Sequence, residues 1–223
     1  MIKYVGVGLV STQKHENHKK EQKMKPRYGF FGGCFNPVTK AHINLARLVV
    51  EQYNLDKLIF VPMGDHYQKS NLANEQHRYE MLKLATKNQA KLEVSDIELN
   101  LPHHLTMLQA FKKIQANYKE VTPYFIIGAD NLIKLTGLSD FETLAKNYEY
   151  IIIKRDIPLK RLFTEEPILQ QYHTHFHILE KNPYKQISAS EARALLKSRQ
   201  EREIDTMISA EVFDYIRKNG LYE

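Results

Sequence analysis

From Tyr28 onward, short apolar runs typical of buried strands alternate with longer segments that carry apolar side chains at helical spacing. The sequence predicts strands at 28–32, 57–62, 91–97, 124–128, 148–154 and 175–180. It predicts helices at 37–53, 74–88, 103–117, 140–147, 189–197 and 209–219. Strands separated by crossover helices are typical of a parallel sheet with right-handed connections. We therefore expect an α/β fold: a doubly wound (Rossmann-like) parallel sheet with helices on both faces and a C-terminal helical segment.

The N-terminal residues stand apart from this alternation. Residues 2–11 are rich in Val, Ile and Tyr and predict a strand, whereas residues 13–25 are polar and basic and predict a linker. We expect residues 1–26 to form an N-terminal extension, either an edge strand with a linker or a loosely attached segment. Residues 27–223 are expected to form a single domain.

Composition narrows the classes of partner. The chain has 223 residues, 43% of them hydrophobic, and a formal net charge of +6, which favours anionic partners such as nucleotides or phosphorylated metabolites. The basic run at 14–25 lacks interleaved aromatic residues, so it favours a solvated linker over a nucleic-acid interface. Cys34 is the only cysteine, which excludes an internal disulfide and favours the cytoplasm. No apolar run reaches the roughly 20 residues of a membrane span, and the sequence predicts no particular oligomeric state.

The stretch GGCFNPVTKAH, residues 32–42, joins the first predicted strand of the domain to its first helix. Gly32 and Gly33 allow a sharp turn and a close approach of the backbone to a ligand. Asn36 is expected to cap the helix, with Pro37 as its first residue. The stretch lacks the GxxxxGK[ST] pattern, which argues against a P-loop nucleotide triphosphatase.

Thr39 and His42 lie three residues apart, so they share one face of the first helical turns. The helix N-terminus beside them presents free N–H groups and a positive dipole end, which favour an anion. Two interpretations stay open on this motif alone. His42 either points at a bound phosphate or packs against the sheet.

A second helix start lies in QISASEARALL, residues 186–196. Ser188 and Glu191 have the spacing of a capping box. Ser190 and Arg193 are also three residues apart and share one face of the helix, and a hydroxyl and a guanidinium at one helix start can clamp a polyphosphate. An ordinary exposed arginine would fit the same pattern.

The opening motif, the sequence GAD at 128–130 and the segment after residue 180 all follow predicted strands. Ligands of doubly wound sheets bind outside the carboxyl ends of the strands. The three segments are therefore expected to meet in one crevice.

Together these stretches resemble the nicotinate/nicotinamide mononucleotide adenylyltransferases of the HxGH nucleotidylyltransferase superfamily. The family pattern G-[TSC]-F-[DN]-P-x-[HT]-x-x-H fits GCFNPVTKAH, and ISASEAR keeps the serines and arginine of I-S-[ST]-[ST]-x-[IL]-R. Further similarity lies at 61–85, 125–132 and 212–222. The resemblance covers residues 27–222 in order.

The chain departs from the family pattern at several positions. Thr39 and Ala41 replace the first histidine and the glycine of HxGH, and Ala189 and Ala192 interrupt the second motif. The chain has no tryptophan, and Leu138 occupies the place of the tryptophan that usually stacks on the pyridine ring. A leucine can pack on a ring face but lacks the stacking preference of an aromatic pair.

The resemblance implies an enzyme of NAD biosynthesis. A mononucleotide 5′-phosphate would attack the α-phosphorus of ATP and release pyrophosphate, a transfer that depends on positioning and charge neutralisation. Catalytic roles are implied for His42, Thr39, Lys69 and Arg193. ATP contacts are implied for Gly33, Cys34, Phe35, His42, Gly128, Asp130, Ser188, Ser190 and Arg193. Mononucleotide contacts are implied for Phe35, Lys69, Thr106 and Leu138.

Mg²⁺ is expected to arrive with ATP and to be held mainly by phosphates, without a metal site built by the protein. His173, His175 and His177 alternate as if they shared one face of a strand, and we expect a packed or solvated face there.

Three functions stay open at this point. The first is adenylyl transfer to nicotinate or nicotinamide mononucleotide. The second is another nucleotidylyltransferase of the same fold, such as phosphopantetheine adenylyltransferase or a cytidylyltransferase. The third is a homologue that binds nucleotide without catalysis.

Overall fold

The computed structural model describes residues 24–66, 71–154, 157–184 and 187–223. The strand predicted at 2–11 and most of the predicted linker lie outside the described residues, as does Lys69.

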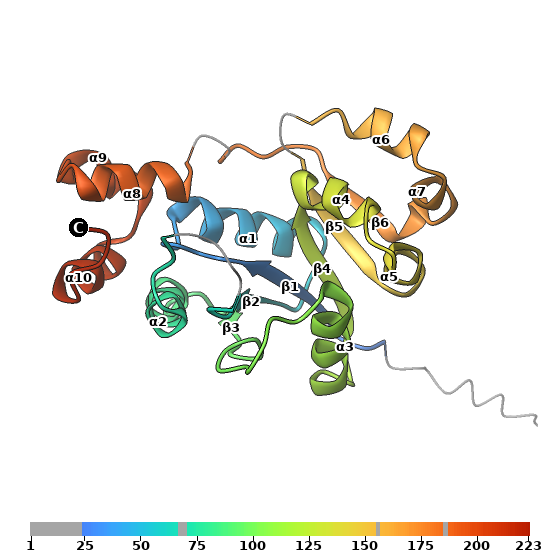
Figure 1. Ribbon diagram of the computed structural model, residues 1–223, viewed down its shortest axis with the longest axis horizontal. Coiled ribbons are helices and arrows are strands. Elements are labelled where there is room, and N and C mark those ends of the chain that lie inside the picture. The colour runs from blue at the N-terminus through green and yellow to red at the C-terminus, as the bar shows by residue number, and fades with distance from the viewer. Residues whose placement is uncertain (1–23, 67–70, 155–156, 185–186) are drawn as a thin grey trace, which may run out of the picture.

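A single parallel sheet forms the centre of the described chain (Figure 1). Its strands are β1 (Arg27–Gly33), β2 (Lys57–Pro62), β3 (Leu92–Val94), β4 (Thr122–Gly128), β5 (Glu149–Ile153) and β6 (Phe176–Leu179). All neighbours pair in parallel, in the order β3-β2-β1-β4-β5-β6. The order reverses between β1 and β4, which confirms the doubly wound fold and places its switch point at the end of β1.

Helices connect and flank the strands. They are α1 (Lys40–Gln52), α2 (Glu75–Thr86), α3 (Met107–Asn117), α4 (Ala129–Thr136), α5 (Phe141–Asn147), α6 (Leu159–Glu165), α7 (Pro167–Gln171), the 3-10 turn η1 (His173–His175), α8 (Ala189–Lys197), α9 (Glu201–Met207) and α10 (Ala210–Lys218). The sequence did not predict α4, α6, α7 or α9. No helix within the described ranges is both long and apolar enough to cross a bilayer.

Successive side chains of each strand point to opposite faces of the sheet and contribute to two hydrophobic cores, one on each face. Phe31 and Phe60 pack with α1, α2 and α8–α10, whereas Phe30 and Phe125 pack with α3–α7. The helices α8, α9 and α10 lie together at one end of the molecule, beside α2 (Figure 1). Helices therefore cover both faces, and the C-terminal helical segment joins the core of α1.

The structure corrects the predicted start of the first helix. Thr39, not Asn36, is the N-cap of α1, and the helix begins at Lys40. Pro37 therefore lies before the helix, after a cis Asn36–Pro37 peptide bond. The side chain of Asn36 makes tertiary hydrogen bonds instead of capping, as described below.

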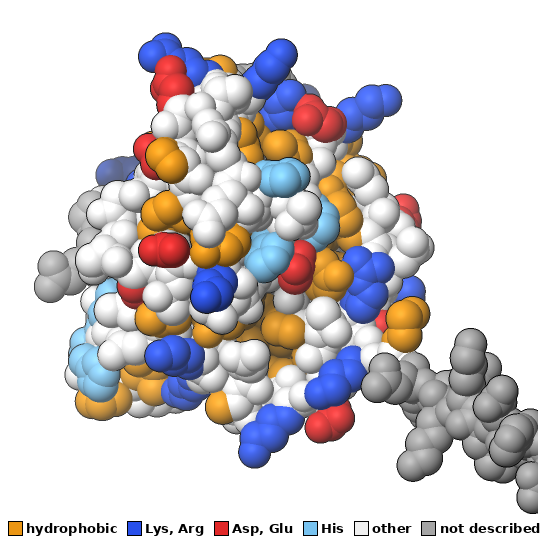
Figure 2. Space-filling view, turned by 90° about the vertical axis from the view of Figure 1, so that its right-hand side faces the viewer, with side chains coloured by type: hydrophobic (Ala, Val, Ile, Leu, Met, Phe, Trp, Pro, Cys, Tyr) orange, Lys and Arg blue, Asp and Glu red, His pale blue; other side chains and the backbone are white. Residues whose placement is uncertain are grey.

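The alternating histidines do not share a strand face, which corrects a second expectation. His173 and His175 lie in η1, and only His177 belongs to β6, where its Nε2 lies 2.8 Å from Oε2 of Glu149. Histidine side chains are visible on the face shown in Figure 2. Within the described residues, no group of three or more His, Cys, Asp and Glu side chains is arranged to hold a metal ion.

Candidate functional site

A buried aromatic ring, that of Phe35, lies in the turn between β1 and α1. Phe35 is 3% exposed, and its backbone has a φ of 46°, in the left-handed region. A Cβ on Gly33 would lie 3.0 Å from the Phe35 ring, so this position favours glycine. The ring also lies edge-on to His42, with centroids 5.2 Å apart. The turn therefore packs a buried apolar ring against the imidazole of His42.

His42 is held by Thr39 in one orientation. The backbone N–H of Thr39 donates to Nδ1 of His42 at 3.0 Å, and the Thr39 hydroxyl lies 2.8 Å from the same nitrogen. Because Nδ1 accepts, the neutral ring carries its proton on Nε2, which makes Nε2 the donor of the ring. Thr39 itself is only 2% exposed. The pair therefore combines helix capping with a fixed histidine tautomer at a half-buried position.

Asn36 connects the opening motif to three other segments of the chain. Its Nδ2 donates to the carbonyl of Asn71 at 2.8 Å, and its Oδ1 accepts from the backbone N–H of Ala73 at 3.0 Å. The same oxygen accepts from the Tyr222 hydroxyl at 2.7 Å. Its main-chain carbonyl accepts from Nη1 of Arg193 at 2.6 Å. Asn36 is 4% exposed, so these bonds form in a desolvated setting.

The start of α8 has the arrangement that the second motif predicts. The Ser188 hydroxyl accepts from the backbone N–H of Glu191 at 3.1 Å, which confirms the N-cap. Arg193 Nη2 donates to the Ser190 hydroxyl at 3.2 Å, and Nη1 reaches Asn36. The guanidinium therefore links the two motifs, which lie 157 residues apart.

Arg78 is a buried charge that no sequence pattern predicts. Its side chain is 0% exposed and donates to the carbonyls of Cys34 and Ala73 at 3.0 and 2.8 Å. It also donates to Oδ1 of Asp65 at 3.1 Å. Arg78 thus fixes the loop after β2 against the opening motif. An arginine within a helical apolar pattern gives no signal of this kind in the sequence.

The loop after β2 is also tied to the loop after β3. A carboxylate oxygen of Glu75 accepts from the N–H of Asp65 at 2.7 Å, and the other accepts from the N–H of Asn100 at 2.8 Å. A Cβ on Gly64 would lie 2.6 Å from the carbonyl of Glu98, so the two loops approach at a glycine. Burial raises the pKa of Glu98 to about 7.

Other predicted residues lie at the ends of their own elements. Gly128 is the N-cap of α4 and Asp130 lies in its first turn, at the carboxyl end of β4 beside β1. Thr106 caps α3, and its hydroxyl accepts from the N–H of Gln109 at 3.3 Å. Leu138 follows α4 and is 43% exposed.

Cys34 is half-buried, and its Sγ lies 4.0 Å from the sulfur of Met63. Its carbonyl is the group that Arg78 holds. A Cβ added at Gly32 would meet nothing within 4 Å, so the packing favours glycine at Gly33 but not at Gly32.

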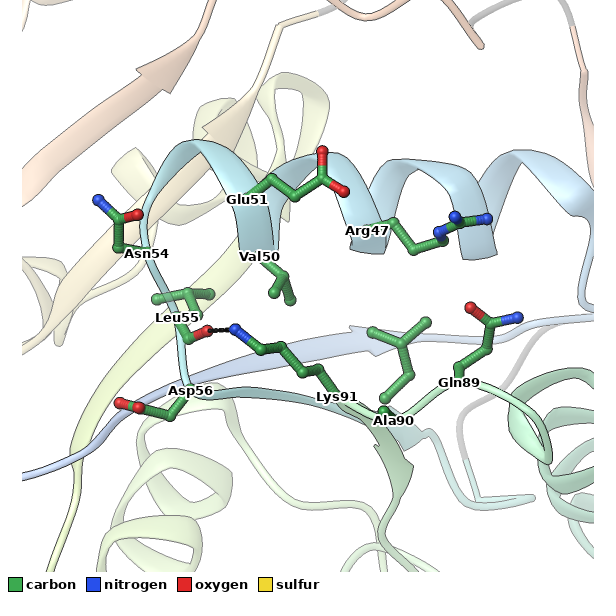
Figure 3. Close-up of a pocket in the computed structure, with 10 residues that line it drawn as sticks. Arg47, Val50, Glu51, Asn54, Leu55, Asp56, Gln89, Ala90 and Lys91 are labelled. Atoms are coloured by element: carbon green, nitrogen blue, oxygen red, sulfur yellow. Dashed lines mark hydrogen bonds between the residues drawn. The ribbon is translucent and has the colours of Figure 1, made fainter.

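A cavity of about 490 Å³ lies at the opposite edge of the sheet (Figure 3). Asp56 precedes β2 and Leu92 begins β3, so this cavity is at the amino ends of the strands. Arg47, Glu51 and Lys91 line it with opposed charges. The donors expected for phosphates lie instead at the carboxyl ends, and we place the candidate site there.

Comparison with known proteins identifies relatives over most of the chain. The cytidylyltransferase-like family model matches residues 30–195. A probable nicotinate-nucleotide adenylyltransferase of Carboxydothermus hydrogenoformans is 33% identical, covering 88% of this chain and 98% of the relative. A protein of the same description from Bacillus licheniformis is 31% identical with the same coverage.

Solved structures share the fold. The nicotinic acid mononucleotide adenylyltransferase of Plasmodium falciparum, complexed with NaAD, superposes with a TM-score of 0.70 at 22% identity, covering 88% of this chain and 97% of that one. A nicotinate-nucleotide adenylyltransferase structure from Vibrio parahaemolyticus gives a TM-score of 0.60 at 18% identity, covering 88% and 95%.

Proposed function

This chain belongs to the nicotinate-nucleotide adenylyltransferases of the cytidylyltransferase-like family, and we propose that it transfers the adenylyl group of ATP to nicotinate mononucleotide. The products are the dinucleotide and pyrophosphate, in NAD biosynthesis. The single observation that carries this proposal is the bond between Arg193 and Asn36, which joins the two motifs at the carboxyl edge of the sheet. The joined motifs bring a guanidinium, a hydroxyl and a helix N-terminus to one place, a donor set suited to polyphosphate.

His42 is the residue proposed to act on the reacting phosphate. An oxygen of the mononucleotide 5′-phosphate forms a bond to the α-phosphorus of ATP, and the bond to the β-phosphate oxygen breaks as pyrophosphate leaves. With Nδ1 occupied by Thr39, Nε2–H of His42 donates to an α-phosphate oxygen and stabilises the charge that develops there. No side chain needs to act as a nucleophile.

Thr39 is proposed to act through His42. Its burial and its two contacts to Nδ1 support a role in orienting the ring, in place of a direct contact with phosphate. Arg193 with Ser188 and Ser190 is proposed to hold the β- and γ-phosphates. Lys69 is proposed, from the family resemblance, to bridge the incoming phosphate and the polyphosphate.

The remaining assignments complete the two substrate sites. The backbone of Gly33, Cys34 and Phe35 is proposed to contact both substrates. Gly128 and Asp130, at the neighbouring strand end, are proposed to contact ATP. Thr106 and Leu138 are proposed to lie on the pyridine side, with Leu138 packing on the ring face through its exposed apolar surface.

A divalent cation, Mg²⁺, is proposed to enter with ATP. The described residues offer no cluster of three ligands, and Asp130 supplies a single carboxylate near the strand end. That donor set fits an ion held mainly by phosphate oxygens and water, as Mg²⁺ usually is beside nucleotides. The ion would neutralise charge on the polyphosphate.

Incubation of the purified protein with ATP, Mg²⁺ and either nicotinate or nicotinamide mononucleotide tests the proposal. We expect dinucleotide and pyrophosphate in equal amounts, with nicotinate mononucleotide as the better substrate because the relatives carry that name. Parallel incubations with phosphopantetheine and ATP, and with CTP and a phosphorylated alcohol, examine the other transferases of this fold. Product from neither pyridine mononucleotide would contradict the proposal.

A further inference from the structure

The last residues of the chain return to the opening motif. Beyond α10, Gly220 and Tyr222 both have left-handed backbones, with φ values of 58° and 67°. This conformation is uncommon for a residue with a side chain. It directs the Tyr222 hydroxyl to Oδ1 of Asn36, at 2.7 Å. Burial raises the pKa of the Tyr222 phenol, so the hydroxyl keeps its proton and remains a donor at neutral pH.

The bond from Tyr222 is the third hydrogen bond to the side-chain amide of Asn36. Oδ1 accepts from both Tyr222 and Ala73, and Nδ2 donates to Asn71, so only one of the two amide orientations satisfies all partners. The main chain of the same residue accepts from Arg193. A short chain of hydrogen bonds therefore runs from the C-terminal tyrosine to the guanidinium.

We propose that Tyr222 is a positioning residue for the polyphosphate end of the active site, acting through Asn36 on Arg193. This inference rests on the proposed function. The Tyr222 hydroxyl touches no reacting atom. It restrains the side chain of Asn36, whose main-chain carbonyl anchors Arg193, and so limits the movement of the guanidinium where the leaving phosphates bind.

Tyr222→Phe tests this inference because it removes the hydroxyl and keeps the ring. Tyr215→Phe is the matched control, since the Tyr215 hydroxyl of α10 bonds to Nδ1 of His77 at 3.0 Å, away from Asn36. For Tyr222→Phe we expect the KM for ATP to rise roughly 3- to 10-fold, the effect of losing one net hydrogen bond. The KM for the mononucleotide and kcat should stay within about twofold, and Tyr215→Phe should leave all three within the same range.

A merely structural role would reduce the folded fraction, which lowers the apparent kcat and leaves both KM values unchanged. That pattern, or equal KM values for ATP in the two variants, would overturn the inference. The affinity of each variant for the non-hydrolysable α,β-methylene analogue of ATP, measured by calorimetry, tests the positioning role of Tyr222 independently of the proposed reaction. If the wild-type protein forms no dinucleotide, the proposed function fails, while weaker analogue binding by Tyr222→Phe alone would still support positioning. Equal analogue binding by both variants would refute it.

Discussion

Replacing Arg78 with methionine should destabilise the fold more than any loss of an exposed charge. Methionine has a similar length and fills much of the same space, but it donates no hydrogen bonds. The carbonyls of Cys34 and Ala73 would each lose the buried donor that Arg78 supplies. The carboxylate of Asp65 would lose its cation.

The magnitude follows from the burial of each partner. Each of these part-buried carbonyls, left without its donor, costs about 1–3 kcal/mol. The Asp65 side chain is 39% exposed, so water replaces much of its lost partner and this contribution is small. The sum is about 2–6 kcal/mol, a large share of the roughly 5–15 kcal/mol by which domains are stable.

Thermal and urea unfolding measure this change. For a chain of this length, the loss corresponds to a fall in Tm of roughly 4–24 °C, with an unchanged urea m-value. Lys57→Met is the matched control, because it removes a cation from an exposed pair with Glu93 whose loss costs less than about 1 kcal/mol. An Arg78→Met protein that melts within about 2 °C of the wild type would show that the buried Arg78 bonds contribute little to stability.

Three further predictions address the site and the core. Burial raises the pKa of Glu98 from 4.5 to about 7, so the folded protein holds this proton more tightly than the unfolded chain does. Proton binding therefore favours the folded state by about 3 kcal/mol below pH 4.5, and this contribution is lost as the pH rises through 7. Glu98→Gln should flatten the stability profile between these pH values, and an unchanged slope would contradict the assignment. Tyr150→Phe leaves the carbonyl of Leu144 without its donor and should lower Tm by roughly 2–8 °C in the same melting assay, whereas no change would contradict the buried bond. Leu138→Trp should lower the KM for nicotinate mononucleotide roughly 2- to 10-fold by stacking, and an unchanged KM would place Leu138 away from the pyridine ring.

The sheet and the two motifs could be predicted because their signals are local. The strand at Lys57–Pro62 and the helix at Ala189–Lys197 have the bounds that periodicity predicts. The Ser188 cap could be predicted because its partner lies only three residues away. The approach of the two motifs to each other could be predicted because both follow strands of one parallel sheet, whose carboxyl ends lie at the same edge.

The network around Asn36 could not be predicted from the sequence. Its partners lie 35 to 186 residues away, so no local pattern contains them. The sequence predicts Asn36 as the helix cap because asparagine is a common N-cap. In the structure, the Asn36 side chain bonds to distant residues instead, and Thr39 is the N-cap. Short helices such as α6 and α7 were missed because each buries few side chains and shows little periodicity.

The most direct test of the proposed active site is the kcat of a folded His42→Ala protein with ATP, Mg²⁺ and nicotinate mononucleotide. His175→Ala is the matched control, because its Nδ1 bonds to the carbonyl of Ala145, away from the opening motif. We expect kcat to fall about 100-fold in His42→Ala, as when one transition-state donor is lost, and to stay within about twofold in His175→Ala. Near-normal turnover by a correctly folded His42→Ala protein would contradict it.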